Sequence, residues 1–388
     1  MRLTREEEDI LNGEHGAAAA KSMEILLAIG KIFGAENLIP VTSTQISGVS
    51  YKTIGDAGLE FLENFAKDGR VRVPSYLNPC GMDLEEWKGM GFPKDFAKKQ
   101  MKIVRAYQKM GVESTCTCTP YLIGILPKKG EHIAWSESSA VIFANSALGA
   151  RTNRESGISA LASAITGKTP YFGYHLDENR VAEVVFNVKA KLEDISDFGA
   201  LGIYAGGIAK QRVVAFEGIE DFTVDEVKAV GAALAASGAV ALFFIEGVTP
   251  EWRIAEKPER IEFGAKELKE TKEDLNSSND AELIAIGCPH CSLEEIKEIA
   301  EKVRGKRLRR KLWVCTARKI KTKADKLGLT KIIEEAGGKI VSDTCMVVAP
   351  LEDMDFRCTA VNSGKAAHYL PSFCKQKVLF GSLKDILE

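Results

Sequence analysis

Hydrophobic and polar positions along the chain recur with two different spacings, and their order predicts strands that alternate with helices. Residues 16–33 carry apolar side chains three and four positions apart, which predicts an amphipathic helix. Thr4 followed by Glu7 is a capping-box pattern and predicts a short helix that ends near Gly13. An apolar stretch that turns into hydroxyl residues over 38–50 predicts a strand running into a loop of small residues.

The same order continues through the first half of the chain. A strand over residues 72–77 is followed by a loop at 78–81, a helical stretch and the loop around Cys118. Strands that alternate with helices form mainly parallel sheets covered by helices on both faces. Ligands of such sheets bind beyond the carboxyl ends of the strands. We therefore expect the loops at 48–50, 78–81 and 116–121 to lie close together.

The 388 residues allow two or three domains of ordinary size. We expect three units: an N-terminal α/β domain at 1–186, a smaller α/β domain with a linker at 187–280, and a C-terminal α/β domain at 281–388. The charged run 266–280 is the expected linker between the last two. The predicted fold class is a multi-domain three-layer α/β/α protein with mainly parallel sheets.

Composition excludes several classes of function. A formal net charge of −2 gives no reason to expect nucleic acid or an anionic membrane as a partner. The sequence contains no run of about 18 apolar residues, so no membrane span is indicated. The acidic, helix-forming N-terminus is unlike a secretory signal, so we expect a cytoplasmic protein. In that reducing compartment, nine scattered cysteines indicate metal ligation or burial and do not indicate a disulfide framework.

Three cysteines, Cys118, Cys288 and Cys345, each stand where a predicted strand ends. Thiolates can bind zinc or iron. A closed zinc site is the weaker choice, because only Cys288 and Cys291 have the Cys-x₂-Cys spacing and no second pair follows. An iron–sulfur cluster with three cysteine ligands would leave one iron open to a substrate oxygen, which suits elimination of water better than electron transfer.

The alternatives at these loops stay open. Cys116 and Cys291 are each possible ligands in place of their neighbours Cys118 and Cys288. Residues two apart on an extended segment face the same way, so Cys116 could point with Cys118. The remaining thiols are interpreted as small buried apolar groups, which free cysteine commonly is: Cys80, Cys315, Cys358 and Cys374.

Small polar residues at loop positions are candidates for binding an anionic substrate. The backbone N–H groups of Gly48–Ser50 and the Ser50 hydroxyl could hold an anionic oxygen at a helix N-terminus, although such loops are more often plain turns. Ser363–Lys365 combines a hydroxyl, a glycine and a positive charge, or is simply a helix start with a solvated lysine. Arg151 could clamp a carboxylate or pair with a structural acid.

Five segments taken together resemble the aconitase X family, and the likeness spans nearly the whole chain. The chain length is similar to that of the large subunit of the two-subunit archaeal type, without the swivelling domain that single-chain members carry fused. The segments that carry the resemblance are 117–121 (TCTPY), 145–153 (NSALGARTN), 287–290 (GCPH), 343–345 (DTC) and 362–365 (NSGK).

The resemblance implies an aconitase-like fold and the dehydration of (R)-5-phosphomevalonate to trans-anhydromevalonate 5-phosphate, a step of an archaeal mevalonate route to isoprenoids. It implies that Cys118, Cys288 and Cys345 hold a [4Fe–4S] cluster, which readily loses its unligated iron to give [3Fe–4S]. It also implies a separate small subunit that carries the swivelling domain and forms a heterodimer with this chain.

By the same resemblance, the expected substrate contacts are Gly48, Val49, Ser50, Asn78, Pro79, Ser138, Ser139, Ser363, Gly364 and Lys365. Ser363 is the candidate catalytic base within this chain, and a serine of the swivelling domain on the partner is the alternative. Two rival functions remain: dehydration of cis-3-hydroxy-L-proline by a member of the same family, and a non-catalytic iron–sulfur protein.

Overall fold

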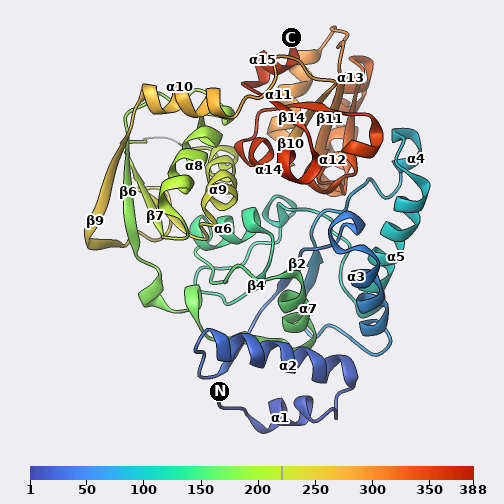
Figure 1. The fold of residues 1–388 in the computed structure, drawn as a ribbon, viewed down its shortest axis with the longest axis vertical. Coiled ribbons are helices and arrows are strands. Elements are labelled where there is room, and N and C mark those ends of the chain that lie inside the picture. The colour runs from blue at the N-terminus through green and yellow to red at the C-terminus, as the bar shows by residue number, and fades with distance from the viewer. Residues whose placement is uncertain (220–221) are drawn as a thin grey trace.

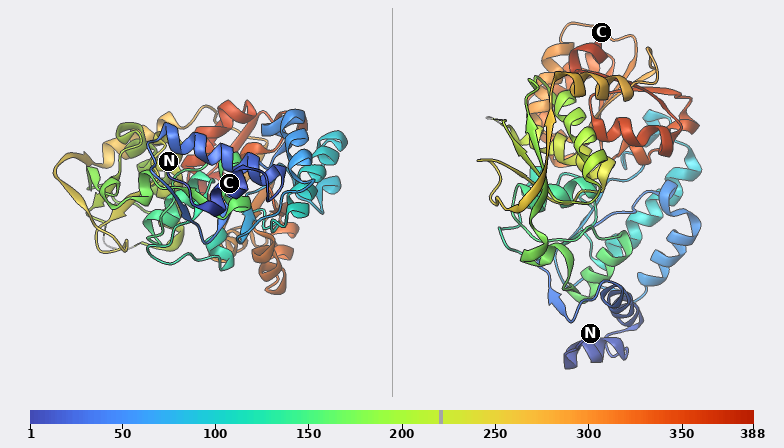
Figure 2. Two further views of the ribbon diagram at one scale, coloured as in Figure 1. Left: turned by 90° about the horizontal axis from the view of Figure 1, so that it is seen from below. Right: turned by 60° about the vertical axis from the view of Figure 1, so that its left-hand side comes forward.

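The computed structural model describes residues 1–219 and 222–388 and shows three α/β parts packed around a common centre (Figure 1, Figure 2). The N-terminus lies at one end of the molecule and the C-terminus at the other (Figure 1). Four sheets are formed, and among the described residues only β1 and β5 pair antiparallel. The predicted α/β class with mainly parallel sheets is confirmed.

The N-terminal part contains the three-stranded parallel sheet β3-β2-β4, whose carboxyl ends face the centre of the molecule. The capping box of Thr4 and Glu7 is present, and the helix predicted over 16–33 is α2. The elements are α1 (Arg5–Leu11), α2 (Ala17–Ile32), β1 (Leu38–Pro40), β2 (Thr44–Ile46), α3 (Tyr51–Phe65), β3 (Ser75–Leu77), α4 (Trp87–Met90), α5 (Lys94–Met110), the 3₁₀ turn η1 (Pro120–Ile123), β4 (Ala134–Trp135), α6 (Ser138–Ser146), α7 (Gly157–Thr166) and β5 (Lys168–Pro170).

The middle part is a parallel sheet of order β8-β7-β6-β9 covered by α8 and α9. These two helices approach closely because glycine removes the side chain at the contact: a Cβ at Gly238 would overlap the carbonyl oxygen of Gly206. The elements are η2 (Gly173–His175), η3 (Asp177–Asn179), β6 (Ala182–Val188), α8 (Ile195–Ala209), β7 (Val214–Glu217), α9 (Val224–Gly238), β8 (Phe243–Ile245), β9 (Ile254–Phe263) and α10 (Ala265–Asp274).

Two expectations about the limits of this middle part need revision. The boundary expected after residue 186 falls inside β6, which pairs along its length with β7 and β9. The linker expected at 266–280 is wrong for most of its length, because Ala265–Asp274 form α10. Charges in this run have helical spacing, and Lys266 and Lys269 each pair with a glutamate four residues on. The charged run is therefore the solvated face of a helix.

The C-terminal part is a five-stranded parallel sheet of order β12-β11-β10-β13-β14 with helices packed against it. The helical residues 318–335 are divided into α12 and α13 at Gly328, whose φ is +71°. The elements are β10 (Leu283–Cys291), α11 (Leu293–Val303), β11 (Lys311–Thr316), α12 (Arg318–Lys326), α13 (Leu329–Glu335), β12 (Gly338–Ser342), η4 (Met346–Val348), η5 (Leu351–Met354), β13 (Cys358–Val361), α14 (Gly364–Cys374), β14 (Lys377–Phe380) and α15 (Leu383–Leu387).

Within β10 the parallel pairing with β11 is interrupted between Ile286 and Cys291. Gly287 lies in this interruption with φ +102°, and a Cβ there would overlap the carbonyl oxygen of Cys315. The strand therefore bends at the position that carries Cys288. None of the helices in the described part of the chain has the length and apolar character that a bilayer crossing requires.

Candidate active site

The loops that follow β2, β3, β4 and β12 surround one cavity of about 300 Å³, which α14 also borders. These loops lie between the N-terminal and C-terminal parts of the molecule (Figure 1). The expected gathering of loops at strand ends is thus observed. The predicted site residues that line the cavity are Gly48, Val49, Ser50, Asn78, Pro79, Ser138, Cys345 and Lys365.

One wall of the cavity is the loop between β2 and α3. Gly48 has φ +73°, and the backbone N–H groups of Gly48, Val49 and Ser50 donate to no other described residue. The Ser50 hydroxyl is already used, since it donates to the carbonyl oxygen of Val348 at 2.8 Å and accepts from the N–H of Lys52 at 3.3 Å. Backbone N–H groups, rather than the hydroxyl, are therefore the groups here that are free to bind an anion.

A buried carboxylate, Glu137, stands just before α6 and organises another wall of the cavity. Its oxygens accept hydrogen bonds from Asn78 at 2.8 Å, from Ser138 at 3.3 Å, from Ser139 at 3.1 Å and from the ammonium group of Lys365. The same ammonium group donates to Ser139 at 3.2 Å. Four predicted substrate residues are thus joined through one carboxylate that the sequence analysis did not single out.

Both members of this buried pair are ionised at neutral pH. Burial by itself would raise the pKa of Glu137, but the charge and hydrogen bonds of Lys365 outweigh it and lower the pKa to about 2. Burial would likewise lower the pKa of Lys365, whereas Glu137 and, less strongly, Cys288 and Cys118 raise it above its usual value. Lys365 is only 6% exposed, so its charge reaches the cavity through low-dielectric surroundings.

Ser363 and Gly364 lie beside the cavity and not in its lining. They border a narrow crevice together with Cys288. Ser363 is the N-cap of α14: its hydroxyl donates to the carbonyl oxygen of Cys288 and accepts from the N–H of Ala366 at 3.2 Å. Gly364 packs against Gly199 so closely that a Cβ would overlap the backbone there. Both residues support the Cys288 segment.

The three cysteines favoured by the sequence, Cys118, Cys288 and Cys345, lie in one neighbourhood. Burial is the largest cause that raises the pKa of each thiol, to about 12 for Cys118, and Lys365 opposes the rise in all three. Cys345 contributes to the raised pKa of both Cys118 and Cys288, and Cys118 contributes to that of Cys288. The backbone N–H of His290 contacts the sulfur of Cys118 across 172 residues of sequence, so folding brings the Cys118 and Cys288 segments together.

His290 joins the three cysteine segments. Its backbone N–H donates to the sulfur of Cys118 at 3.2 Å, its Nδ1 lies 3.0 Å from the hydroxyl of Thr117, and its Nε2 lies 2.9 Å from the carbonyl oxygen of Thr344. Burial lowers the pKa of His290 to about 4, so the ring is neutral. The carbonyl oxygen of Thr344 can only accept a hydrogen bond, so Nε2 carries the proton and donates to it. Nδ1 then accepts from the hydroxyl of Thr117.

The two alternative cysteines have other neighbours. The sulfur of Cys116 lies 3.5 Å from that of Cys80, and both side chains are fully buried. Cys291 is surrounded by Glu295 and Lys228, whose charges are the leading electrostatic influences on its pKa.

Two arginines near the cavity have different surroundings. Arg151, considered above as a clamp, donates to the carboxylate of Asp177 at 2.6 Å and lies outside the cavity lining. Arg154 lines the cavity, is exposed, and forms no hydrogen bond or ion pair with another described residue. Of the two cations in the lining, Arg154 and Lys365, only Lys365 is neutralised by a carboxylate of the protein.

Sequence reasoning missed Glu137, His290 and Arg154. Glu137 had a local signal, since a carboxylate directly after a strand and before an apolar helical run is typical of an N-terminal helix position. Its partner Lys365 lies 228 residues away, and no spacing in the sequence connects the two. The contacts of His290 likewise join three distant segments, so their geometry becomes visible only in the folded chain.

The donor set fits an iron–sulfur cluster better than a single metal ion. Among residues 1–219 and 222–388, no three His, Cys, Asp or Glu side chains converge on one ion position. A cluster does not require such convergence, because each cysteine binds a different iron atom. Three sulfurs in one neighbourhood, two of them buried and one accepting a backbone N–H, are the kind of donors that such clusters use.

Comparisons with known proteins agree along the whole chain. Residues 1–178 match the aconitase X first domain, 182–273 the second domain and 281–388 the third domain. The chain is 54% identical over 403 residues to the phosphomevalonate dehydratase large subunit of Methanocaldococcus jannaschii, with all of both chains covered. It is 35% identical to cis-3-hydroxy-L-proline dehydratase of Hypocrea jecorina, covering 99% of this chain and 67% of that protein.

A solved structure gives the same result for the fold. The crystal structure of Thermococcus kodakaraensis aconitase X in its holo-form superposes with a TM-score of 0.94 at 48% sequence identity, covering 100% of this chain and 99% of that chain. Family domains, full-length relatives and fold all coincide, and this chain belongs to the aconitase X family.

Proposed function

We propose that this chain is the large subunit of a hydro-lyase that dehydrates (R)-5-phosphomevalonate to trans-anhydromevalonate 5-phosphate in a mevalonate route to isoprenoids. Relatives named phosphomevalonate dehydratase large subunit are 48–54% identical over nearly their full length. The observation that carries the proposal is a single cavity lined by free backbone N–H groups, an unpaired arginine, Cys345 and a buried lysine. A substrate with an anion at each end matches this arrangement.

The phosphate of the substrate is proposed to bind to the wall formed by Gly48–Ser50 and Arg154. The N–H groups of that loop stand at the N-terminus of α3, where the helix dipole favours negative charge. The Arg154 segment lies against the same loop, since Gly157 packs on the carbonyl group of Ser47. An arginine can bind phosphate through two parallel N–H donors.

Cys118, Cys288 and Cys345 are proposed to hold a [4Fe–4S] cluster, which can be recovered as [3Fe–4S]. When bound, the cluster supplies an open iron that acts as a Lewis acid toward the hydroxyl group to be eliminated. The buried thiols need their protons removed for ligation, and the charge of Lys365 favours their thiolate forms.

Lys365 is proposed to hold the substrate carboxylate. An ammonium group has three N–H donors, and two of them donate to Glu137 and Ser139. The third is proposed to donate to the substrate, because Lys365 lines the cavity. Negative charge builds on the carboxylate as the neighbouring carbon loses its proton, and a fixed ammonium group stabilises that charge more in the transition state than in the ground state.

We propose that the catalytic base comes from a small subunit and that Ser363 is a positioning residue. Both hydrogen-bonding roles of the Ser363 hydroxyl are taken by Cys288 and Ala366, and Ser363 borders the crevice instead of the cavity. The cavity opens to the surface, as a site completed by a partner requires. A heterodimer with a small swivelling-domain subunit is consistent with the name "large subunit" borne by the relatives.

The proposed substrate is tested with the anaerobically reconstituted large and small subunits. We expect water loss from (R)-5-phosphomevalonate, measured as formation of the dehydrated product by mass spectrometry. We expect no reaction with cis-3-hydroxy-L-proline, which lacks a phosphate. The large subunit alone serves as control and should be inactive without the partner's base. Turnover of the proline compound with no turnover of phosphomevalonate would refute the proposal.

Arg154→Gln is expected to raise KM for phosphomevalonate at least about tenfold, because a charge-assisted contact to phosphate contributes about 1.5–3 kcal/mol. Arg154→Lys should recover part of the loss, since it keeps the charge without the planar pair of donors. Arg309→Gln changes an exposed arginine of the C-terminal part and is the matched control. Steady-state kinetics that show equal KM values for Arg154→Gln and Arg309→Gln would exclude Arg154 from phosphate binding.

A further inference from the structure

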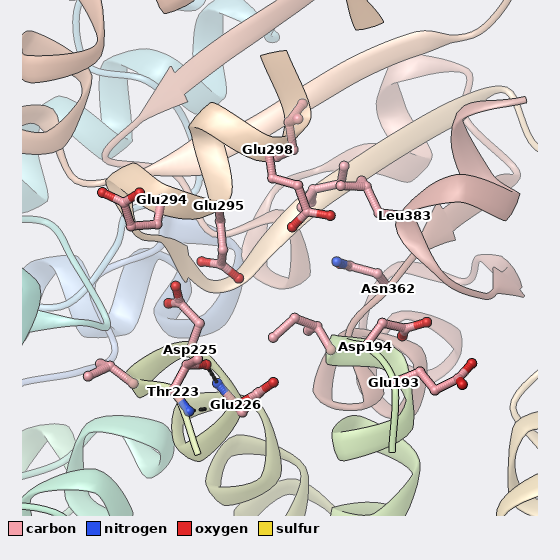
Figure 3. A pocket seen from close by; sticks show the side chains of 14 residues that line it. Glu193, Asp194, Thr223, Asp225, Glu226, Glu294, Glu295, Glu298, Asn362 and Leu383 are labelled. Carbon is pink, nitrogen blue, oxygen red and sulfur yellow. Dashed lines mark hydrogen bonds between the residues drawn. The ribbon is translucent and has the colours of Figure 1, made fainter. Parts of the chain in front are cut away.

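A second cavity, of about 500 Å³, opens where the N-terminal ends of α8, α9 and α11 meet (Figure 3). It lies between the middle and C-terminal parts and shares no lining residue with the proposed active-site cavity. Seven carboxylates line it, and no Lys, Arg or His is found among the described residues of its lining. The cavity is therefore strongly acidic.

Four of these carboxylates have partners within the protein. Asp194 and Glu226 accept backbone N–H groups in the first turns of α8 and α9 and thereby cap these helices. Asp225 and Glu295 both accept from the buried ammonium group of Lys228. These contacts account for the four side chains without any ligand.

The other three carboxylates, Glu193, Glu294 and Glu298, are not accounted for in this way. Each pairs only with a lysine of its own segment, at the exposed rim of the cavity. Such surface pairs contribute little and exchange readily with solvent ions. Glu298 extends into the cavity from α11 (Figure 3). These three groups remain available to a positively charged ligand.

Asn362 provides independent evidence for a ligand. It is 7% exposed, its amide points into the cavity (Figure 3), and that amide forms no hydrogen bond with another described residue. An amide that points into a cavity and has no partner in the protein is free to bind a ligand there. The amide oxygen of Asn362 can accept a hydrogen bond from an ammonium group, which the neighbouring carboxylates also bind.

The shape and the walls of the cavity identify the class of ligand. In the described part of the chain no three such carboxylates converge on an ion position, and the volume far exceeds that of a metal ion. Aliphatic side chains lie between the carboxylates: Ile195, Ile286, Ile299 and Leu383. Separated negative charges with apolar surface between them suit a flexible chain of methylene groups that carries ammonium groups at intervals.

We propose that this cavity binds an aliphatic polyamine. Its ammonium groups pair with Glu298 and the neighbouring carboxylates, its methylene chain packs on the isoleucines, and one N–H donates to Asn362. The ligand bridges α8 and α9 of the middle part to α11 of the C-terminal part. Asn362 directly precedes Ser363, which supports the Cys288 segment, so the bound polyamine holds the back of the proposed cluster loop.

The proposal is tested by isothermal titration of putrescine and spermidine into the full chain. We expect saturable binding with about one ligand per chain, and an increase in melting temperature on binding. Glu298→Gln and Asn362→Leu should each weaken the affinity at least about tenfold, the change that loss of one charge-assisted contact produces. Glu301→Gln removes an exposed carboxylate of the same helix outside the cavity and should bind as the unchanged chain does.

Three results would overturn the proposal. They are the absence of saturable heat, equal stabilisation by Mg²⁺ or NaCl at matched ionic strength, and equal weakening by Glu298→Gln and Glu301→Gln. Glu298 and Glu301 are both exposed, so this pair of variants folds normally and keeps the test decisive even if Asn362→Leu is unstable.

Discussion

Replacing Lys365 with methionine is expected to destabilise the chain by about 3–5 kcal/mol and to reduce dehydratase activity at least about 10²-fold. The side chain is buried, and its ammonium group is the only cation paired with Glu137 among the described residues. Methionine fills a similar volume but leaves the carboxylate of Glu137 without its counter-charge. The measurements are urea unfolding of the isolated chain and steady-state kinetics of the reconstituted enzyme.

The double variant Glu137→Gln with Lys365→Met separates the two contributions. It removes both charges, and the glutamine amide at position 137 can still form hydrogen bonds with its neighbours. The free energy of unfolding should therefore recover by about 1–3 kcal/mol relative to Lys365→Met. Activity should not recover, because the ammonium group proposed to face the substrate carboxylate is still absent. Lys21→Met, in an exposed pair with Glu24, is the control and should change neither quantity measurably.

The pH dependence of stability gives a further check on this pair. The pKa of Glu137 is lowered from 4.5 to about 2 in the folded chain, so its contribution is present above pH 4.5 and is lost as the pH falls toward 2. The pKa of Lys365 is raised above 10.5, so its contribution is complete below pH 10.5 and is lost as the pH rises further. The unchanged chain should therefore gain or lose no stability from this pair between about pH 5 and pH 10. In Lys365→Met, burial raises the pKa of Glu137 because its counter-charge is gone, so the destabilisation should become smaller as the pH falls and the carboxyl is protonated. A destabilisation that does not decrease at low pH would contradict the ion pair.

Local patterns predicted the elements well where one segment determines its own structure. The capping box at Thr4, the helix over 16–33 and the strands ending at loops 48–50 and 78–81 depend on neighbours in sequence, and all are present. The run 266–280 was misjudged because charge content received more weight than its helical spacing. Gly328, which separates α12 from α13, has the left-handed conformation that glycine commonly adopts at a helix end.

The candidate site was predictable to the level of loops and not to the level of contacts. Parallel-sheet topology places the loops after strands at one edge, which is why Gly48–Ser50, Asn78 and Cys345 could be expected together. The bond between Lys365 and Glu137 depends on how the C-terminal part docks on the N-terminal part, and no local pattern encodes that docking. The same holds for Ser363, whose hydroxyl the fold commits to Cys288 and α14.

Replacing Cys118, Cys288 or Cys345 singly with alanine is expected to remove the visible absorption of the cluster and to lower activity by about 10³-fold or more. Each thiol is proposed to bind a different iron, so losing one leaves the cluster with two protein ligands. Loss of the Lewis acid removes several kcal/mol of transition-state stabilisation. Absorption spectra, iron and acid-labile sulfide content, and activity are measured on anaerobically purified protein with and without the small subunit.

Cys116→Ala and Cys291→Ala distinguish the ligands from their neighbours. Cys116 contacts Cys80 and Cys291 lies near Glu295, so both variants should retain the cluster, with a loss of stability of about 1 kcal/mol from the smaller side chain. Cys358→Ala, on β13 in the C-terminal sheet, controls for loss of any buried thiol. The sulfur of Cys118 accepts the N–H of His290, which lies two residues after Cys288. The Cys288 segment therefore helps to orient Cys118. Retention of iron and sulfide in Cys288→Ala together with their loss in Cys291→Ala would move the ligand by three residues and contradict the arrangement of all three loops.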